Sequence, residues 1–137
     1  MNHQDNKQTI EPVPYSLDQI ARQVVSAACN VHSSLGPGLL ESVYEACLAH
    51  EVGKRGLSVR RQVPVPVNYD NVRLDLGFRL DLVVKEALIV EIKAVDALHP
   101  VHYAQMITYL KLTNLRLGLL INFNVPLIKE GIHRIAL

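Results

Sequence analysis

The chain has 137 residues, a length that fits one domain, and its hydrophobic content of 49% is enough for one continuous core between a sheet and several helices. Its formal net charge of +1 excludes a strong whole-molecule field that would draw it toward a polyanion, so any such site must be local. Cys29 and Cys47 lack CxxC spacing and nearby histidine pairs, which argues against structural zinc and a disulfide framework and is compatible with a reducing compartment.

The first segment of the chain differs in composition from the rest. Residues 1–14 are polar and contain two prolines, which predicts a flexible N-terminal tail, and residues 15–137 are expected to form a single domain. The tail has no apolar run and no basic start of the kind found in secretion signals, and no later stretch is long enough without charge to span a bilayer. The expected location is therefore the cytoplasm, with no membrane partner.

Two helices are predicted at the start of the domain. Ser16 followed by Gln19 is typical of a capping box, and apolar residues then recur at helical spacing as far as Leu35. The Gly36-Pro37-Gly38 segment ends this helix, and a second helix is expected over residues 39–55. Its predicted apolar face consists of Leu40, Val43, Tyr44, Cys47, Leu48 and Val52.

From residue 57 the apolar period changes to two, which predicts strands. The first strand is expected to carry one face made of Val59, Arg61, Val63, Val65 and Val67. Pro64 and Pro66 lack amide hydrogens and confine this strand to an edge of the sheet or to pairing on one side. After a turn at residues 69–71, a strand is expected from 72 to 84, continuous or divided near Gly77.

A turn at Lys85-Glu86 leads into residues 87–93, whose nearly continuous apolar run predicts a central strand buried on both faces. A third helix is expected from His99-Pro100 to about residue 113, followed by a strand over 115–123, a loop over 124–131 and a short closing strand over 132–137. The fold class is therefore α/β, in the order ααβββαβ, with a mixed central sheet flanked by helices.

Three charged residues fall where the sheet should bring them together. Side chains alternate across a strand, so Glu91 and Lys93 point to the same side. The turn at Lys85-Glu86 folds the preceding strand back, so that Asp81 falls close to Glu91 or Lys93. Two carboxylates and an ammonium group then converge.

Burying unpaired carboxylates costs folding free energy, so a buried group of this kind indicates a bound cation, or a function that requires the charges, as compensation for this cost. Mg²⁺ takes oxygen ligands and commonly uses one or two protein carboxylates together with substrate phosphate oxygens, and Mn²⁺ accepts similar ligands. The metal would polarise a phosphoryl group and activate a bound water, with Lys93 orienting that water or offsetting developing charge. The chemistry favoured is hydrolysis of a phosphodiester.

Asp81 followed by Glu91-Ile-Lys93 resembles the D...(D/E)xK signature of the PD-(D/E)XK nuclease superfamily, although Leu80 stands where that signature has proline. Gly38-Leu-Leu-Glu41-Ser-Val-Tyr44 is similar to the signature of the GxxExxY protein family within it. The resemblance extends over roughly residues 16–137 and implies a restriction-endonuclease-like core. It also implies a metal-dependent nuclease that acts on nucleic acid, with DNA favoured over RNA.

The resemblance gives roles to further residues. Glu41 matches an acidic residue of the first core helix that faces the metal, so the implied ligands are Glu41, Asp81 and Glu91 of a Mg²⁺ or Mn²⁺ ion, with Lys93 completing the catalytic set. Gln105 and Tyr109 form a QxxxY pair similar to that of RecB-like exonucleases, and are expected to contact substrate or support the site. Tyr44 is more readily explained as a packed aromatic under the site.

Several alternatives stay open from the sequence. A lone histidine is usually structural, so His32 and His102 are not assigned to the metal. Four basic residues near the end of the second helix could bind phosphates, although the ordinary surface charges of a solvated turn account for them as well; they are Lys54, Arg55, Arg60 and Arg61. The alternative function is an inactive module of the same fold that binds nucleic acid or protein. Superfamily relatives often pair subunits, so a homodimer is also compatible with the sequence.

Overall fold

The structure is a computed structural model that describes residues 11–75 and 77–137. In chain order its elements are α1 (Tyr15–Leu35), α2 (Glu41–Lys54), β1 (Val59–Pro64), β2 (Val67–Tyr69), β3 (Val72–Leu74), β4 (Arg79–Val84), β5 (Leu88–Lys93), α3 (Pro100–Thr113), β6 (Leu117–Asn122), the 3-10 helix η2 (Ile128–Gly131) and β7 (Ile132–Ala136). The α/β class and the order of helices and strands are confirmed. The two extended segments before β5 are each divided in two.

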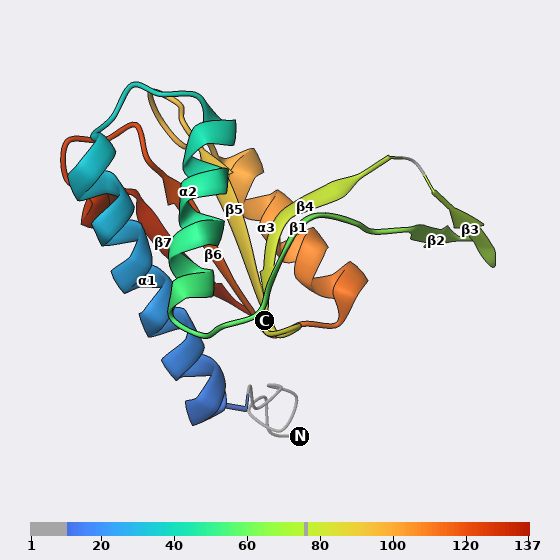
Figure 1. Ribbon diagram of the computed structural model, residues 1–137. Helices are drawn as coiled ribbons and strands as arrows, with labels where there is room; N and C mark the ends of the chain where they lie inside the picture. The colour runs from blue at the N-terminus through green and yellow to red at the C-terminus, as the bar shows by residue number, and fades with distance from the viewer. Residues whose placement is uncertain (1–10, 76) are drawn as a thin grey trace, which may run out of the picture.

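Five strands form one mixed sheet in the order β1-β4-β5-β6-β7. Strands β5 and β6 are parallel, and the other neighbouring pairs are antiparallel. Helices α1 and α2 cover one face and α3 covers the other (Figure 1). Because α3 connects the parallel pair β5 and β6, the sheet is buried on both sides at β5, as the apolar run 87–93 predicted.

The hydrophobic core has one part on each face of the sheet. The larger part packs α1 and α2 against alternate residues of the central strands, among them Leu82, Val90 and Ile121. The smaller part lies under α3, where Met106 and Leu110 are fully buried. Asp81 and Glu91 lie at the end of the paired part of β4 and β5, where these two strands begin to separate.

The predicted start of α1 is partly wrong. The helix begins at Tyr15, and its N-cap is Pro14, whose side chain has no polar atom that could accept a backbone hydrogen bond. Ser16 therefore lies inside the first turn rather than at the cap, and the expected capping box does not form. Residues 1–10 of the predicted flexible tail (1–14) lie outside the described residues, so the division into a tail and a domain from residue 15 stays a prediction.

The predicted apolar face of α2 is also partly wrong. The helix begins at Glu41, so Leu40 is its N-cap and is 74% exposed, and Val43 is exposed as well. The buried face consists of Tyr44, Leu48, Ala49 and Val52, and it also includes the charged residue Glu45. The helix is thus rotated relative to the prediction, and this rotation turns an acidic side chain toward the sheet.

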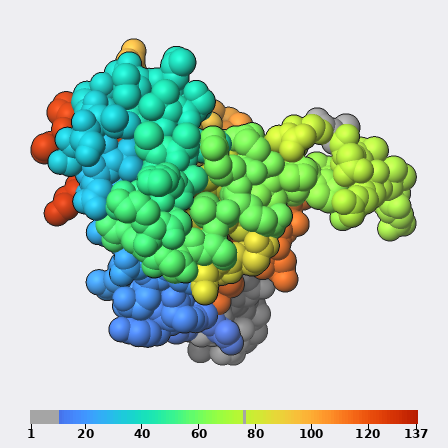
Figure 2. Space-filling view, in the orientation of Figure 1, coloured from blue at the N-terminus to red at the C-terminus, as the bar shows by residue number. Residues whose placement is uncertain are grey.

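A two-stranded hairpin, β2 and β3, projects from the body of the protein (Figures 1 and 2). The pairing of β1 with β4 ends just beyond Pro64 with the bond from the amide of Val65 to the carbonyl of Phe78, because Pro66 has no amide hydrogen to continue it. Gly77, with φ of 74°, turns the chain back toward β4. The break after Val65 divides the predicted strand over residues 57–67, and the break at Gly77 confirms the divided form of the strand predicted over residues 72–84. As Pro64 and Pro66 predicted, β1 is an edge strand.

The expected single apolar face of residues 59–67 is interrupted at Gln62. This residue has φ of 51°, a left-handed conformation that is uncommon outside glycine. The side chains of both Arg61 and Gln62 turn toward α2, whereas Val63 packs in the cluster under α3. Regular alternation would have placed Arg61 and Val63 on the same face, so the prediction is wrong at this point.

Candidate active site

The β4–β5 hairpin determines where the acidic residues lie. Lys85 and Glu86 both have positive φ, 55° and 54°, as a type I′ turn requires, and the amide of Ala87 closes the turn by donating to the carbonyl of Val84 at 3.0 Å. Val84 is level with Leu88, so Ala87 is one extra residue on the side of β5. The pairing continues to Leu82 and Val90 and then stops. Asp81 and Glu91 would form the next pair, so they lie where the two strands part.

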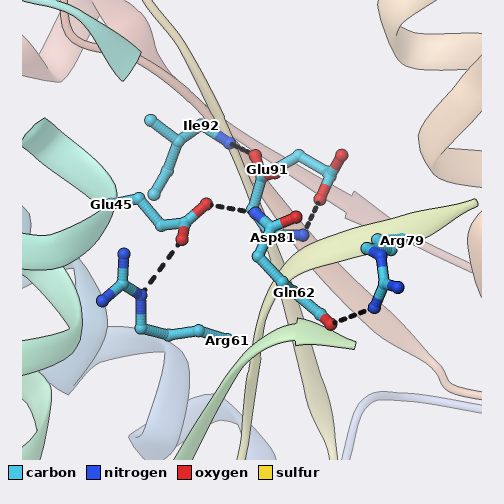
Figure 3. Close-up of polar contacts among 7 residues, drawn as sticks. All are labelled: Glu45, Arg61, Gln62, Arg79, Asp81, Glu91 and Ile92. Carbon is cyan, nitrogen blue, oxygen red and sulfur yellow. Dashed lines mark hydrogen bonds and ion pairs between the residues drawn. The ribbon is translucent and has the colours of Figure 1, made fainter. Parts of the chain in front are cut away.

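At this point side chains replace the backbone ladder. The amide of Asp81 donates to Glu91 Oε2 at 2.8 Å, and the amide of Ile92 donates to Asp81 Oδ2 at 2.8 Å (Figure 3). Each carboxylate thus occupies a position that a strand carbonyl would normally take. The exchange anchors both side chains between β4 and β5, and it leaves one oxygen of each carboxylate without a hydrogen bond among the described residues.

The two carboxylates are poorly solvated. Burial, followed by the charge of Asp81, raises the pKa of Glu91 to about 8. Burial is also the main cause that raises the pKa of Asp81, while its bond from the Ile92 amide lowers it. Lys93 lowers the pKa of both, but too little to reverse the shifts. The pair therefore resists carrying two negative charges when no cation is bound.

Glu41 and Lys93 lie at the end of β5. Glu41 is the first residue of α2, and its Oε2 accepts a hydrogen bond of 3.3 Å from the amide of Ala94, the residue after the strand. Lys93 is half-buried and forms no ion pair within the described part of the chain, so its ammonium is available. The structure therefore brings α2 to the open end of the acidic pair.

Sequence reasoning missed Glu45, which lies one turn after Glu41 on α2. It is 7% exposed, and its two carboxylate oxygens accept hydrogen bonds from Arg61 Nε at 3.1 Å and from Gln62 Nε2 at 2.6 Å. Its charge contributes to the raised pKa of Asp81 and of Glu91. The i, i+4 spacing from Glu41 was the signal in the sequence that could have revealed it.

Tyr44 supports the loop before α2. Its hydroxyl donates to the carbonyl of Gly36 at 2.6 Å and accepts from the amide of Leu39 at 3.1 Å. Its ring is fully buried and stacks on Phe123, with centroids 4.6 Å apart. These contacts make Tyr44 a packing residue that ties the Gly36–Gly38 loop to the core.

Helix α3 presents the residues of the QxxxY pair. Tyr109 packs against Phe78, with ring centroids 4.7 Å apart, and its pKa is raised to about 12 by burial and then by Glu91 and Asp81. Its hydroxyl thus lies in the field of the acidic pair. Gln105 is exposed one turn earlier, and its side chain forms no hydrogen bond with residues 11–75 or 77–137.

The two histidines that were left unassigned have different surroundings. His32 Nε2 lies 2.8 Å from the carbonyl of Val125, which is a structural contact between α1 and the loop before η2. His102 Nδ1 accepts a hydrogen bond from the amide of His99 at the start of α3. Burial and then the charge of Lys93 lower the pKa of His102, so this ring borders the site in its neutral form at pH 7.

Asn122 is a second residue that sequence reasoning missed. It is 3% exposed at the end of β6, and its side chain pairs with both the amide and the carbonyl of Val95, at 3.1 and 2.9 Å. The amide of Phe123 also donates to the carbonyl of Lys93 at 2.9 Å. Together these bonds hold the segment after β5 in place, and Lys93 with it.

The chemistry of the donor set fits a hard divalent cation, because buried carboxylates without enough positive charge are stabilised by such an ion. Within residues 11–75 and 77–137, however, no group of three or more His, Cys, Asp or Glu side chains is arranged to hold a metal ion. Asp81 and Glu91 are together, and Glu41 meets the same strand one step further on. The ligand set Glu41, Asp81 and Glu91 therefore stays a proposal.

A mixed sheet with helices on both faces, and acidic residues where two central strands part, is the architecture of restriction-endonuclease-like proteins. A family model described as the PD-(D/E)XK nuclease superfamily matches residues 18–135. Because this match covers most of the chain, the protein belongs to the PD-(D/E)XK nuclease superfamily. Searches of curated proteins and of solved structures gave no significant match. Among the described residues, no helix is both long and apolar enough to cross a membrane.

Proposed function

We propose that this protein is a divalent-metal-dependent nuclease that hydrolyses phosphodiester bonds in DNA. The observation that carries the proposal is the exchange of hydrogen bonds between Asp81 and the β5 strand at Glu91, which fixes two carboxylates side by side in a poorly solvated position. Such an arrangement is costly for stability alone, and it suits a site that receives a cation. Membership of the nuclease superfamily supports the same conclusion.

In this proposal Asp81, Glu91 and Glu41 hold a Mg²⁺ or Mn²⁺ ion. When bound, the ion would polarise the phosphoryl group and lower the pKa of a bound water. Lys93 orients the attacking water and offsets charge that develops on the phosphate oxygens. Tyr109 is protonated at neutral pH, as an ordinary tyrosine is, and the rise of its pKa to about 12 extends this to alkaline pH. Its hydroxyl donates a hydrogen bond toward the substrate, and Gln105 contacts the substrate one turn away.

We also propose that the chain is of the GxxExxY type within the superfamily, because each motif residue has a separate physical task. Gly38 has φ of 98°, which a glycine adopts without strain. Tyr44 ties the same loop to the core through Gly36 and Leu39. Glu41 lies between them and reaches the end of β5. The motif thus sets the position of one acidic side chain.

The experiment combines metal binding with cleavage. Millimolar Mg²⁺ or Mn²⁺ is expected to raise the melting temperature of the wild type, because ligand binding to the native state adds stability by mass action. Asp81→Ala should remove this rise, whereas Glu51→Gln, whose side chain bonds Asn30 of α1 and not β5, should keep it. Manganese-dependent cleavage of single-stranded, duplex or branched DNA should be lost in Glu91→Ala and in Lys93→Ala. Cleavage that survives both substitutions would refute the proposed site.

A second candidate function is a module that kept the fold and binds nucleic acid or protein without cutting it. The observation that favours it is that Glu41 bonds to the amide of Ala94 and does not complete a three-carboxylate group. This candidate predicts no metal-dependent rise in melting temperature and no cleavage under any of the conditions above. The same two measurements therefore separate the candidates.

The remaining parts of the proposal concern partners and location. We propose DNA in preference to RNA, and a homodimer, in which two such small domains would face one duplex. Cleavage of matched DNA and RNA substrates and sedimentation analysis test these two points. Cys29 and Cys47 are both free thiols, which is compatible with a reducing compartment, and we propose the cytoplasm.

A further inference from the structure

The acidic groups around the site repel a polyanionic substrate. Glu41, Glu45, Asp81 and Glu91 lie around the parting of β4 and β5, and a nucleic-acid backbone brings one further negative charge with each phosphate. Lys93 is one cation at this point. The structure contains a second cation, Arg61, on the neighbouring edge strand (Figure 3).

Arg61 is anchored at one end and open at the other. Its Nε donates to Glu45 Oε2 at 3.1 Å, and the Glu45 side chain is only 9% exposed, whereas the Arg61 side chain is 47% exposed. Within the part of the chain that the structure describes, no hydrogen bond engages the two terminal nitrogens of Arg61. The guanidinium is thus held in place while two of its nitrogens face solvent with their donors free, a geometry that suits phosphate oxygens.

A strained residue maintains this arrangement. Gln62 has φ of 51° in the middle of β1, and its side chain donates to Glu45 Oε1 at 2.6 Å. Two consecutive residues of one strand therefore reach the same carboxylate, which regular alternation does not allow. Unfavourable backbone conformations persist where the surroundings over-determine them, and they gather at functional sites.

The preceding residue gives the contrast. Arg60 donates from Nε and from Nη2 to the two carboxylate oxygens of Glu86, both at 2.6 Å. Its side chain therefore points toward the turn between β4 and β5. Its fork is occupied by an exposed partner. Two neighbouring arginines of β1 thus each pair with a glutamate, but only Arg61 is paired through Nε alone, and its partner Glu45 belongs to α2 beside the acidic residues.

We propose that Arg61 binds a backbone phosphate of the nucleic-acid substrate next to the acidic pair, and that Glu45 and Gln62 are positioning residues for its guanidinium. This inference rests on the proposed nuclease function. It assigns a contact to the sugar-phosphate backbone, so it contributes affinity and register without sequence preference. It also explains why a buried glutamate is placed beside a site that is already rich in carboxylates.

The test measures DNA binding by fluorescence anisotropy in an Asp81→Asn background, which prevents cleavage and removes one repulsive charge. Arg61→Gln and Arg60→Gln each remove one positive charge from adjacent positions, so they are matched. Arg61→Gln should weaken binding on the order of tenfold and reduce the slope of log affinity against log salt concentration by about one phosphate contact. Arg60→Gln should leave both close to the parent values.

Arg61→Lys keeps a partner for Glu45 and protects the fold, so it serves as the second variant. It should retain the salt slope but lose part of the affinity, because an ammonium lacks the planar fork. Equal affinity of the Arg61 and Arg60 variants, while the wild type cleaves DNA, overturns this inference alone. A wild type that neither binds nor cleaves any nucleic acid overturns it together with the proposed function.

Discussion

Replacing Glu91 with glutamine should change how the stability of the protein depends on pH. In the folded state the pKa of Glu91 is raised from 4.5 to about 8. The folded protein therefore holds a proton that the unfolded chain releases once the pH rises above its own pKa. Between these two values the free energy of unfolding falls as the pH rises, by about 1.4 kcal/mol for each pH unit.

Between roughly pH 5.5 and 7.5 this loss amounts to about 2.7 kcal/mol in the metal-free wild type. Asp81, whose pKa is also raised, adds to the loss at the acidic end of the range. Glu91→Gln cannot ionise, yet its amide oxygen still accepts the hydrogen bond from Asp81. The variant should therefore show a much shallower loss over the same range.

The assay is urea denaturation in the presence of a chelator at a series of pH values, followed by circular dichroism. Glu51→Gln is the control, because the hydrogen bond from Asn30 lowers the pKa of Glu51, so this carboxylate is ionised throughout this range. It should keep the slope of the wild type. A Glu91→Gln variant whose slope equals that of the wild type would refute the reasoning that burial keeps Glu91 protonated.

Three further substitutions test the parts of the fold that position the site, each by chemical denaturation. Tyr44→Phe should cost about 1 to 3 kcal/mol, because the carbonyl of Gly36 loses its donor; an unchanged midpoint would contradict this. Gly131→Ala should destabilise the protein by about 1 to 3 kcal/mol, because the added Cβ would overlap the carbonyl of Asn122. Gly53→Ala is its control: the added Cβ meets nothing within 4 Å, so this variant should be neutral or stabilising. Lys85→Asn should stabilise by roughly 0.5 kcal/mol because asparagine tolerates the positive φ, and a loss of stability would count against the type I′ turn.

The acidic pair lies in the part of the fold that local rules describe well. The apolar run before Glu91 identifies a buried strand, and the turn at Lys85-Glu86 brings Asp81 near Glu91 on the facing strand. Counting from a strict two-residue loop would put Asp81 opposite Val90, but the structure pairs Val84 with Leu88, so the extra residue Ala87 shifts the register by one and brings Asp81 level with Glu91. What counting does not provide is the exchange of side-chain and backbone hydrogen bonds. That exchange arises because β4 and β5 diverge, and strand divergence depends on how both sheet faces pack.

The contribution of α2 was harder to predict because it depends on tertiary contacts. The apolar periodicity of this helix accommodates more than one rotation, and Leu40 and Val43 were assigned to the buried face although both are exposed. The stack of Tyr44 on Phe123 sets the rotation, and with it the burial of Glu45. The positive φ of Gln62 has no local signal either, since glutamine is a rare residue in that conformation.

The projecting β2–β3 hairpin has a consequence for how the chain can vary. None of its six strand residues belongs to either part of the hydrophobic core, and within the described part of the chain its two strands pair only with each other. An isolated pair of short strands is marginally stable in water, so this hairpin should open far more often than the sheet and exchange its amide hydrogens first. Its length and sequence can therefore change between relatives at little energetic cost, while the spacing from Arg79 to Lys93 cannot.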